Sequence, residues 1–162
     1  MIVLGIDPGT AITGFGVVQG VGSKLKAIKY GSILTPAGIP LQERISMIYD
    51  ELLQIISEYK PQEAAIESLF FNDNAKTALS VGHARGVSML ACVKSGVVIA
   101  EYTPLQVKMA LTGYGRADKK QMIYMTKMLL NMEKDPKPDD TADALAIAIC
   151  HLNSRNMNML NK

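Results

Sequence analysis

The sequence has no tryptophan and only two cysteines, Cys92 and Cys150. Both cysteines lie in apolar runs far apart in the chain, so we expect two buried free thiols and neither a disulfide nor a metal site. No apolar run approaches the roughly 20 residues that a membrane-spanning helix needs, and no leader segment precedes the first apolar run. These absences predict a cytoplasmic protein in a reducing compartment.

The chain also lacks a large net charge of either sign. The 17 Lys and Arg residues against 15 Asp and Glu residues give a formal net charge of +2, which is compatible with a nucleic-acid partner but does not require one. The 162 residues suit one domain with one core. We expect that domain at residues 1–155, followed by a frayed tail at 156–162.

The elements alternate in a way that predicts an α/β fold. Residues 2–6 form an apolar run that stops at Pro8-Gly9, which is typical of a buried strand, and two more strands should follow in an antiparallel meander. The further strands are expected at 13–19, 24–34, 64–67 and 97–102. Helices are expected at 41–59, 72–94, 118–131 and 140–152, with a short helix opening at Thr103-Pro104.

Two of the predicted strands end in an acidic residue. Asp7 follows the first strand and Glu67 ends the strand at 64–67. By itself Asp7 has two interpretations: it caps the Pro-Gly bend, or it faces a metal ion or a hydrogen-bond network. If the two strands are parallel neighbours, both carboxylates lie at one rim of the sheet.

A third group of acids opens the last predicted helix. Asp143 lies three residues after Asp140 and four after Asp139, and helical geometry allows either to share its face. Three acids in five positions exceed what a helix cap needs, and their repulsion predicts a cation among them. Oxygen ligands select Mg²⁺ or Mn²⁺, and an acid cluster without a nucleophilic Ser or Cys motif suits two-metal phosphodiester cleavage.

Basic and aromatic residues accompany these acids. Phe70-Phe71 follows Glu67, and the pair is either buried in the core or in contact with nucleic-acid bases, which we favour for one of them. Four cations surround a glycine-rich loop and are either a solvated face or phosphate contacts, which we favour beside an acidic site: Lys108, Arg116, Lys119 and Lys120.

Three other residues attract no specific role. His83 and His151 have no metal-ligand spacing between them and are expected to be structural or surface residues. Arg85 could equally serve packing, an interface or DNA.

The helix predicted at 72–94 carries a face of small and apolar residues at offsets of three and four. A two-fold axis would let such a face pack against its own copy. Its members are Ala75, Ala78, Leu79, Gly82 and Gly86.

Along nearly its whole length the chain resembles the RuvC family of bacterial Holliday-junction resolvases. The matching segments are Gly5-Ile6-Asp7-Pro8-Gly9-Thr10 with Thr13-Gly14-Phe15-Gly16, Ala65-Ile66-Glu67 with Phe70, Asn74-Ala75, Ala78-Leu79 and Gly82 with Ala84-Arg85-Gly86-Val87, Gln106-Val107-Lys108 with Gly113 and Gly115, Lys119, and Ala142-Asp143-Ala144-Leu145-Ala146-Ile147-Ala148.

This resemblance implies an RNase H-like fold: a mixed five-stranded sheet flanked by helices. It also implies a homodimer that resolves four-way DNA junctions with two Mg²⁺ ions per subunit, for which Mn²⁺ could substitute, and leaves 5′-phosphate and 3′-hydroxyl ends. The RuvA–RuvB branch-migration complex is the implied partner. Transferred by position, Phe70 contacts junction bases, Lys108 and Lys119 lie near the scissile phosphate, and the catalytic, metal-binding acids are Asp7, Glu67, Asp140 and Asp143.

The last motif departs from the family's usual Asp-Ala-Ala-Asp. Here it is Asp140-Thr141-Ala142-Asp143, and Asp139 precedes it with no assigned role.

Two other classes of protein are compatible with parts of the sequence. Asp7-Pro8-Gly9-Thr10 also suits a nucleotide-binding lobe of the actin and hexokinase type, but such proteins need two lobes and this chain has room for one. A non-catalytic junction-binding protein would leave the acids unexplained. We therefore predict a junction-resolving endonuclease.

Overall fold

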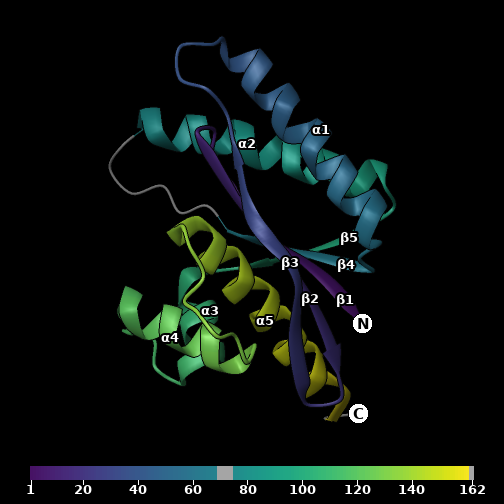
Figure 1. The fold of residues 1–162 in the computed structure, drawn as a ribbon, viewed down its shortest axis with the longest axis vertical. Helices are drawn as coiled ribbons and strands as arrows, with labels where there is room; N and C mark the ends of the chain where they lie inside the picture. The colour runs from purple at the N-terminus through teal and green to yellow at the C-terminus, as the bar shows by residue number, and fades with distance from the viewer. Residues whose placement is uncertain (69–74, 161–162) are drawn as a thin grey trace.

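The computed structural model describes residues 1–68 and 75–160, which form a mixed five-stranded sheet with helices on both faces. The strands are β1 (Ile2–Asp7), β2 (Ile12–Val21), β3 (Lys24–Leu34), β4 (Glu63–Glu67) and β5 (Val98–Tyr102). The helices are α1 (Leu41–Tyr59), α2 (Ala75–Lys94), α3 (Pro104–Thr112), α4 (Lys119–Leu129) and α5 (Asp139–Leu160). The predicted mixed five-stranded sheet is confirmed (Figure 1).

The order of the strands is β3-β2-β1-β4-β5. β1, β2 and β3 form the predicted antiparallel meander, whereas β1 pairs with β4 and β4 with β5 in parallel. The register sets Ile6 opposite Ile66. Asp7 and Glu67, the next residue of each strand, therefore lie at the same edge of the sheet, as expected for parallel neighbouring strands.

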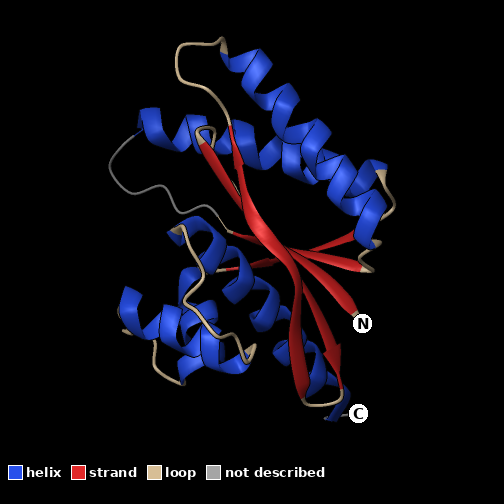
Figure 2. Ribbon diagram, viewed as in Figure 1, coloured by secondary structure: helices blue, strands red, loops and turns tan. Residues whose placement is uncertain are grey.

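Helices cover the two faces of the sheet in two groups. α1 and α2 lie on one face, and α3, α4 and α5 lie on the other (Figures 1 and 2). Alternate residues of β1 supply both cores, because Leu4 and Ile6 pack with α1 and α2 while Val3 packs with the helices opposite. Cys92 lies in the first of these cores and Cys150 in the second, both as buried free thiols. In the described ranges, no helix is long and apolar enough to span a membrane.

α5 lies directly against the sheet backbone. A Cβ atom at Gly5 would collide with the carbonyl oxygen of Ala144, and one at Gly14 with the carbonyl oxygen of Asp140. Only glycine allows this approach. Because Gly14 is opposite Asp7 in the β1–β2 pairing, the first turn of α5 is held beside the acidic edge of the sheet.

The predicted end of the last helix at Leu152 is wrong. α5 continues to Leu160. Its polar residues have partners on other elements: Asn153 Nδ2 donates to the carbonyl oxygen of Ala110 at 3.4 Å, and Arg155 Nη1 lies 2.6 Å from Glu63 Oε1. The apolar periodicity stops at residue 152, so nothing local in the sequence indicates these contacts.

Candidate active site

Four carboxylates from three elements meet at one edge of the sheet. Asp7 is the last residue of β1, Glu67 is the last residue of β4, and Asp140 and Asp143 lie in the first turns of α5. The position of α5 depends on the close approach at Gly14, together with a hydrogen bond of 2.9 Å between the hydroxyls of Ser32 on β3 and Thr141.

The carboxylates disturb one another electrostatically. Burial raises the pKa of Asp7 to about 7, and the negative charges of Asp143, Glu67 and Asp140 add to the effect in that order. Burial and then Asp143 raise the pKa of Glu67. Burial also raises the pKa of Asp143, against the opposing effect of Lys119. The site therefore concentrates more negative charge than it neutralises.

Asp139 and Asp140, which helical spacing left as alternatives, have different surroundings. Asp140 contributes to the raised pKa of Asp7, whereas Asp139 is not among the groups that perturb it. The side chain of Asp139 is 69% exposed, and its Oδ2 atom lies 4.0 Å from Lys119 Nζ. Asp140 thus faces the carboxylate cluster, and Asp139 lies at its rim.

Lys119 is the first residue of α4 and donates a hydrogen bond from Nζ to Asp143 Oδ2. The start of α4 is fixed by a capping box, in which the Asp118 carboxylate accepts from Gln121 N while the Gln121 side chain accepts from Asp118 N. The ammonium is therefore presented to the acids by a helix end of defined geometry.

A cavity of about 270 Å³ adjoins the acids between α3, α4 and α5. Lys108, Glu67, Lys119 and Asp143 supply charged groups to its wall, and much of the remaining wall is apolar. Lys108 is placed there by α3, whose start Thr103 caps as the sequence predicts. The structure thus brings Lys108 and Lys119 to the acidic site.

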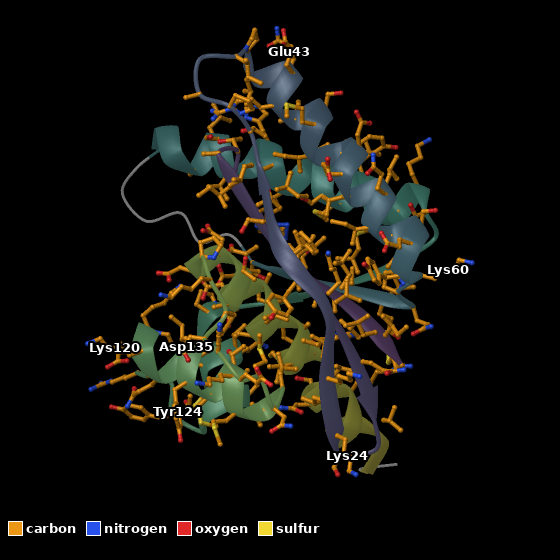
Figure 3. The ribbon with its side chains drawn as sticks, viewed as in Figure 1. Lys24, Glu43, Lys60, Lys120, Tyr124 and Asp135 are labelled. Carbon is orange, nitrogen blue, oxygen red and sulfur yellow. The ribbon has the colours of Figure 1, made fainter. Side chains whose placement is uncertain are left out.

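The other predicted contacts are more distant from this cavity or undescribed. Arg116 and Lys120 are exposed and do not line it, and Lys120 projects outward from α4 (Figure 3). Phe70 and Phe71 lie outside the described residues.

Two of the three residues without an assigned role, His151 and Arg85, have structural contacts, whereas His83 Nδ1 is buried with no hydrogen-bond partner among the described residues. His151 is buried, with Nδ1 2.9 Å from the Tyr102 hydroxyl and Nε2 2.5 Å from Glu63 Oε2. Arg85 pairs with Glu101 on β5. These contacts fit a structural role for both His151 and Arg85. The sequence analysis left that role open as one alternative for each residue.

The chemistry of the carboxylates suits a hard cation, although the geometry is not that of a closed metal site. Within residues 1–68 and 75–160, no three acidic, His or Cys side chains are arranged to hold a metal ion. Asp143 is bonded to Lys119 instead. The donors offer only oxygen, and the raised pKa values indicate that ionised carboxylates here need a compensating positive charge.

Sequence reasoning missed the residues that hold the helix carrying the acids. Ser32 and Thr141 are 109 positions apart and meet only because β3 and α5 pack together. Thr10 and Ser80 likewise join the turn after β1 to α2, with hydroxyls 2.6 Å apart. No local pattern marks such pairs.

The meander, the two parallel strands and the acids at the ends of β1, β4 and the start of α5 define an RNase H-like nuclease. The family model described as "Crossover junction endodeoxyribonuclease RuvC" matches residues 3–151, and the chain belongs to this family. It is accordingly a hydrolase that resolves Holliday junctions.

Relatives and solved structures agree with this assignment. The chain is 56% identical to the RuvC endonuclease of Desulforamulus reducens over 151 residues, which is 93% of each chain. It is 55% identical to that of Alkaliphilus oremlandii over 162 residues, which cover 100% of this chain and 99% of the relative. The structure of Thermus thermophilus RuvC in complex with a Holliday junction substrate has a TM-score of 0.93 at 34% identity, covering 98% of this chain and 96% of that one.

Proposed function

We propose that the chain resolves a junction by paired, metal-dependent nicks that leave 5′-phosphate and 3′-hydroxyl ends. The raised pKa of Asp7 carries this proposal: a buried carboxylate among three other acids needs a cation to remain ionised at neutral pH. A site of that kind can hold the charge of a scissile phosphate only with metal ions present.

Asp7, Glu67, Asp140 and Asp143 would hold two Mg²⁺ ions per subunit, for which Mn²⁺ is a substitute. The ions would supply a water acidic enough to attack phosphorus and would offset the charge of the phosphate. Asp7 is central, since the other three acids all perturb it. Glu67 and the acids of α5 would complete the ligand set.

Lys119 would stabilise the negative charge that develops on the phosphate, because its ammonium already lies against the acids. Lys108, across the adjoining cavity, would bind the phosphate of the same strand. Arg116 and Lys120 would contact the DNA backbone farther out. The prediction that Phe70 and Phe71 contact junction bases rests on the sequence alone.

A homodimer would supply two such sites for the two cuts, and the outer face of α2 supports this arrangement. Leu79 and Val93 are each 65% exposed. A Cβ atom at Gly82 or Gly86 would meet no neighbouring atom of the described residues within 4 Å, so the helix is open to a close partner there. We also propose the RuvA–RuvB complex as a further partner and the cytoplasm as the location.

The test compares a synthetic four-way junction with a linear duplex of matched sequence, each with Mg²⁺, Mn²⁺ or EDTA. We expect symmetric cuts in the junction alone, only with metal, with ends that ligase can rejoin. Asp7→Asn should abolish cutting but leave junction binding within about twofold, because binding rests on phosphate contacts elsewhere. Cutting in EDTA would overturn the metal requirement, and loss of binding together with cutting would make Asp7 a structural residue.

A further inference from the structure

Asp139 is the acid of the last motif that has no role in the proposed function. Its side chain is 69% exposed, and its charge raises the pKa of Asp143 but does not perturb that of Asp7, so it lies at the rim of the carboxylate cluster. Its one close charged partner in the described part of the chain is Lys119, at 4.0 Å. Lys119 therefore lies between two carboxylates of α5, Asp143 toward the site and Asp139 toward solvent.

Once cations are bound, Asp143 and Asp139 are no longer equally good partners for the Lys119 ammonium. Asp143 belongs to the proposed ligand set, and a carboxylate oxygen that binds a cation is a poorer acceptor for an ammonium. The cations would also repel Lys119 directly. Asp139 keeps its charge free for Lys119, since it is displaced from the cluster to the rim.

We propose that Asp139 is a positioning residue, which holds the Lys119 ammonium at the rim of the site when Asp143 is occupied by metal. This proposal rests on the proposed function, because it takes Lys119 to act on the scissile phosphate. Asp139 touches neither metal nor substrate, and it acts only through Lys119. It gives a function to the position at which this sequence adds an acid before its Asp-Thr-Ala-Asp motif.

The simpler alternative is that Asp139 only favours the start of α5, where an acid interacts well with the helix dipole. The two roles differ in their dependence on Lys119. A helix-dipole effect is the same with or without that lysine, whereas a positioning effect disappears when the lysine is removed.

The chain offers a matched control at the other end of α4. Asp135 Oδ1 lies 3.3 Å from Lys127 Nζ, so Asp135 is also an exposed aspartate before α5 that pairs with a lysine of α4. Neither Asp135 nor Lys127 lines the cavity beside the acids. Asp135→Asn thus makes the same change of charge without touching Lys119.

The first experiment measures single-turnover cleavage of a junction at saturating enzyme with Mg²⁺. Asp139→Asn should slow the cleavage step about two- to fivefold, as expected for an exposed ion pair, with junction affinity unchanged. Asp139→Glu should restore most of the rate, and Asp135→Asn should cleave like the unmodified chain. In a Lys119→Ala background, Asp139→Asn should have no further effect.

The second experiment follows the ammonium of Lys119 by ¹⁵N NMR in DNA-free protein titrated with Mg²⁺. The Lys119 signal, assigned by its absence in Lys119→Ala, should stay protected from exchange with solvent after Mg²⁺ binds, and should lose that protection in Asp139→Asn. The Lys127 signal should respond only to Asp135→Asn.

Equal slowing by Asp139→Asn with and without Lys119, or a Lys119 signal that does not respond to Asp139→Asn, would overturn the proposal. A chain that binds junctions but never cuts them would instead contradict the proposed function, and the NMR titration would still decide whether Asp139 holds Lys119.

Discussion

At the scale of single residues, the site is defined by carboxylates that are unfavourable by themselves. Burial and neighbouring acids raise the pKa of Asp7 from 3.8 to about 7. Because this carboxyl binds protons more tightly in the folded than in the unfolded chain, its contribution to stability falls as pH rises from about 4 to about 7. Above that range Asp7 is ionised in the metal-free protein, and the free energy of unfolding is lowered by the full amount.

Asp7→Asn should therefore stabilise the protein in EDTA. Asparagine keeps the shape of the side chain without the charge, so we expect the melting temperature at pH 8 to rise by several degrees, for a gain on the order of 2 kcal/mol. The gain should shrink as pH falls through the range of the shifted pKa and vanish near pH 4. Thermal unfolding across this pH series measures it.

In saturating Mg²⁺ the unmodified chain should have a higher melting temperature than Asp7→Asn, because only the unmodified chain gains stability from the ion. A gain that is the same at pH 4 and pH 8 would show that charge at Asp7 is not its source.

At the scale of elements, α5 carries the acids and is placed by its contact with the sheet. Gly5 and Gly14 let the helix backbone lie against β1 and β2, and Ser32 bonds to its first turn through Thr141. The distal part of the helix is held by Glu63, which accepts from both His151 and Arg155. Two acids of the site thus depend on packing along a helix of 22 residues.

Gly14→Ala should displace the first turn of α5 from β2. The added methyl group would collide with the carbonyl oxygen of Asp140, which is backbone and cannot rotate away. We expect a loss of about 1–3 kcal/mol in the free energy of unfolding, measured in urea, and a large loss of cleavage because Asp140 and Asp143 move.

Gly20→Ala is the matched control on the same strand. Its Cβ would lie 3.0 Å from Leu152 and 3.5 Å from Leu25, and both contacts are flexible side-chain ends. It should unfold and cleave nearly like the unmodified chain. Full cleavage by Gly14→Ala would show that the acids tolerate movement of the helix.

At the scale of the whole molecule, the acidic edge of the sheet and the proposed dimer face belong to different elements. The acids lie where β1, β4 and α5 meet, whereas the exposed face of α2 carries Leu79, Leu90 and Val93. α2 packs with α1 over the opposite side of the sheet from α5 (Figure 1). A partner could therefore bind α2 without displacing the acids at the sheet edge of either subunit.

Gly82→Arg should give a folded monomer. A Cβ atom at Gly82 would meet no neighbouring atom of the described residues within 4 Å, so the fold should persist, but two arginines would meet across a two-fold axis. Sedimentation at micromolar concentration measures the state of association, and circular dichroism measures folding. The monomer should still nick one strand of the junction at a time, but the two nicks should no longer be coordinated.

Gln54→Arg is the control for charge, because Gln54 is exposed on α1. It should remain dimeric. A Gly82→Arg protein that is still a dimer would place the interface on another surface.

The sequence by itself determined the strands, the order of the elements and the acids at their ends. Apolar runs and turn residues act locally, and Ile2–Ile6 with Pro8-Gly9 is enough to predict a strand that delivers Asp7 to an edge. The sequence places Glu67 at the end of a second strand, and the parallel pairing of β1 with β4 in the folded chain brings the two acids to one edge.

Only the tertiary structure decided which neighbours those residues have. Helical spacing makes Asp139 and Asp140 equivalent, and their surroundings in the folded chain show that Asp140 is the one that perturbs Asp7. The helix extends past Leu152 because partners on β4 and α3 hold its polar residues. The contact between Lys119 and Asp143 also depends on tertiary structure. The two residues are 24 positions apart and meet because α4 packs against α5, which no local pattern in the sequence predicts.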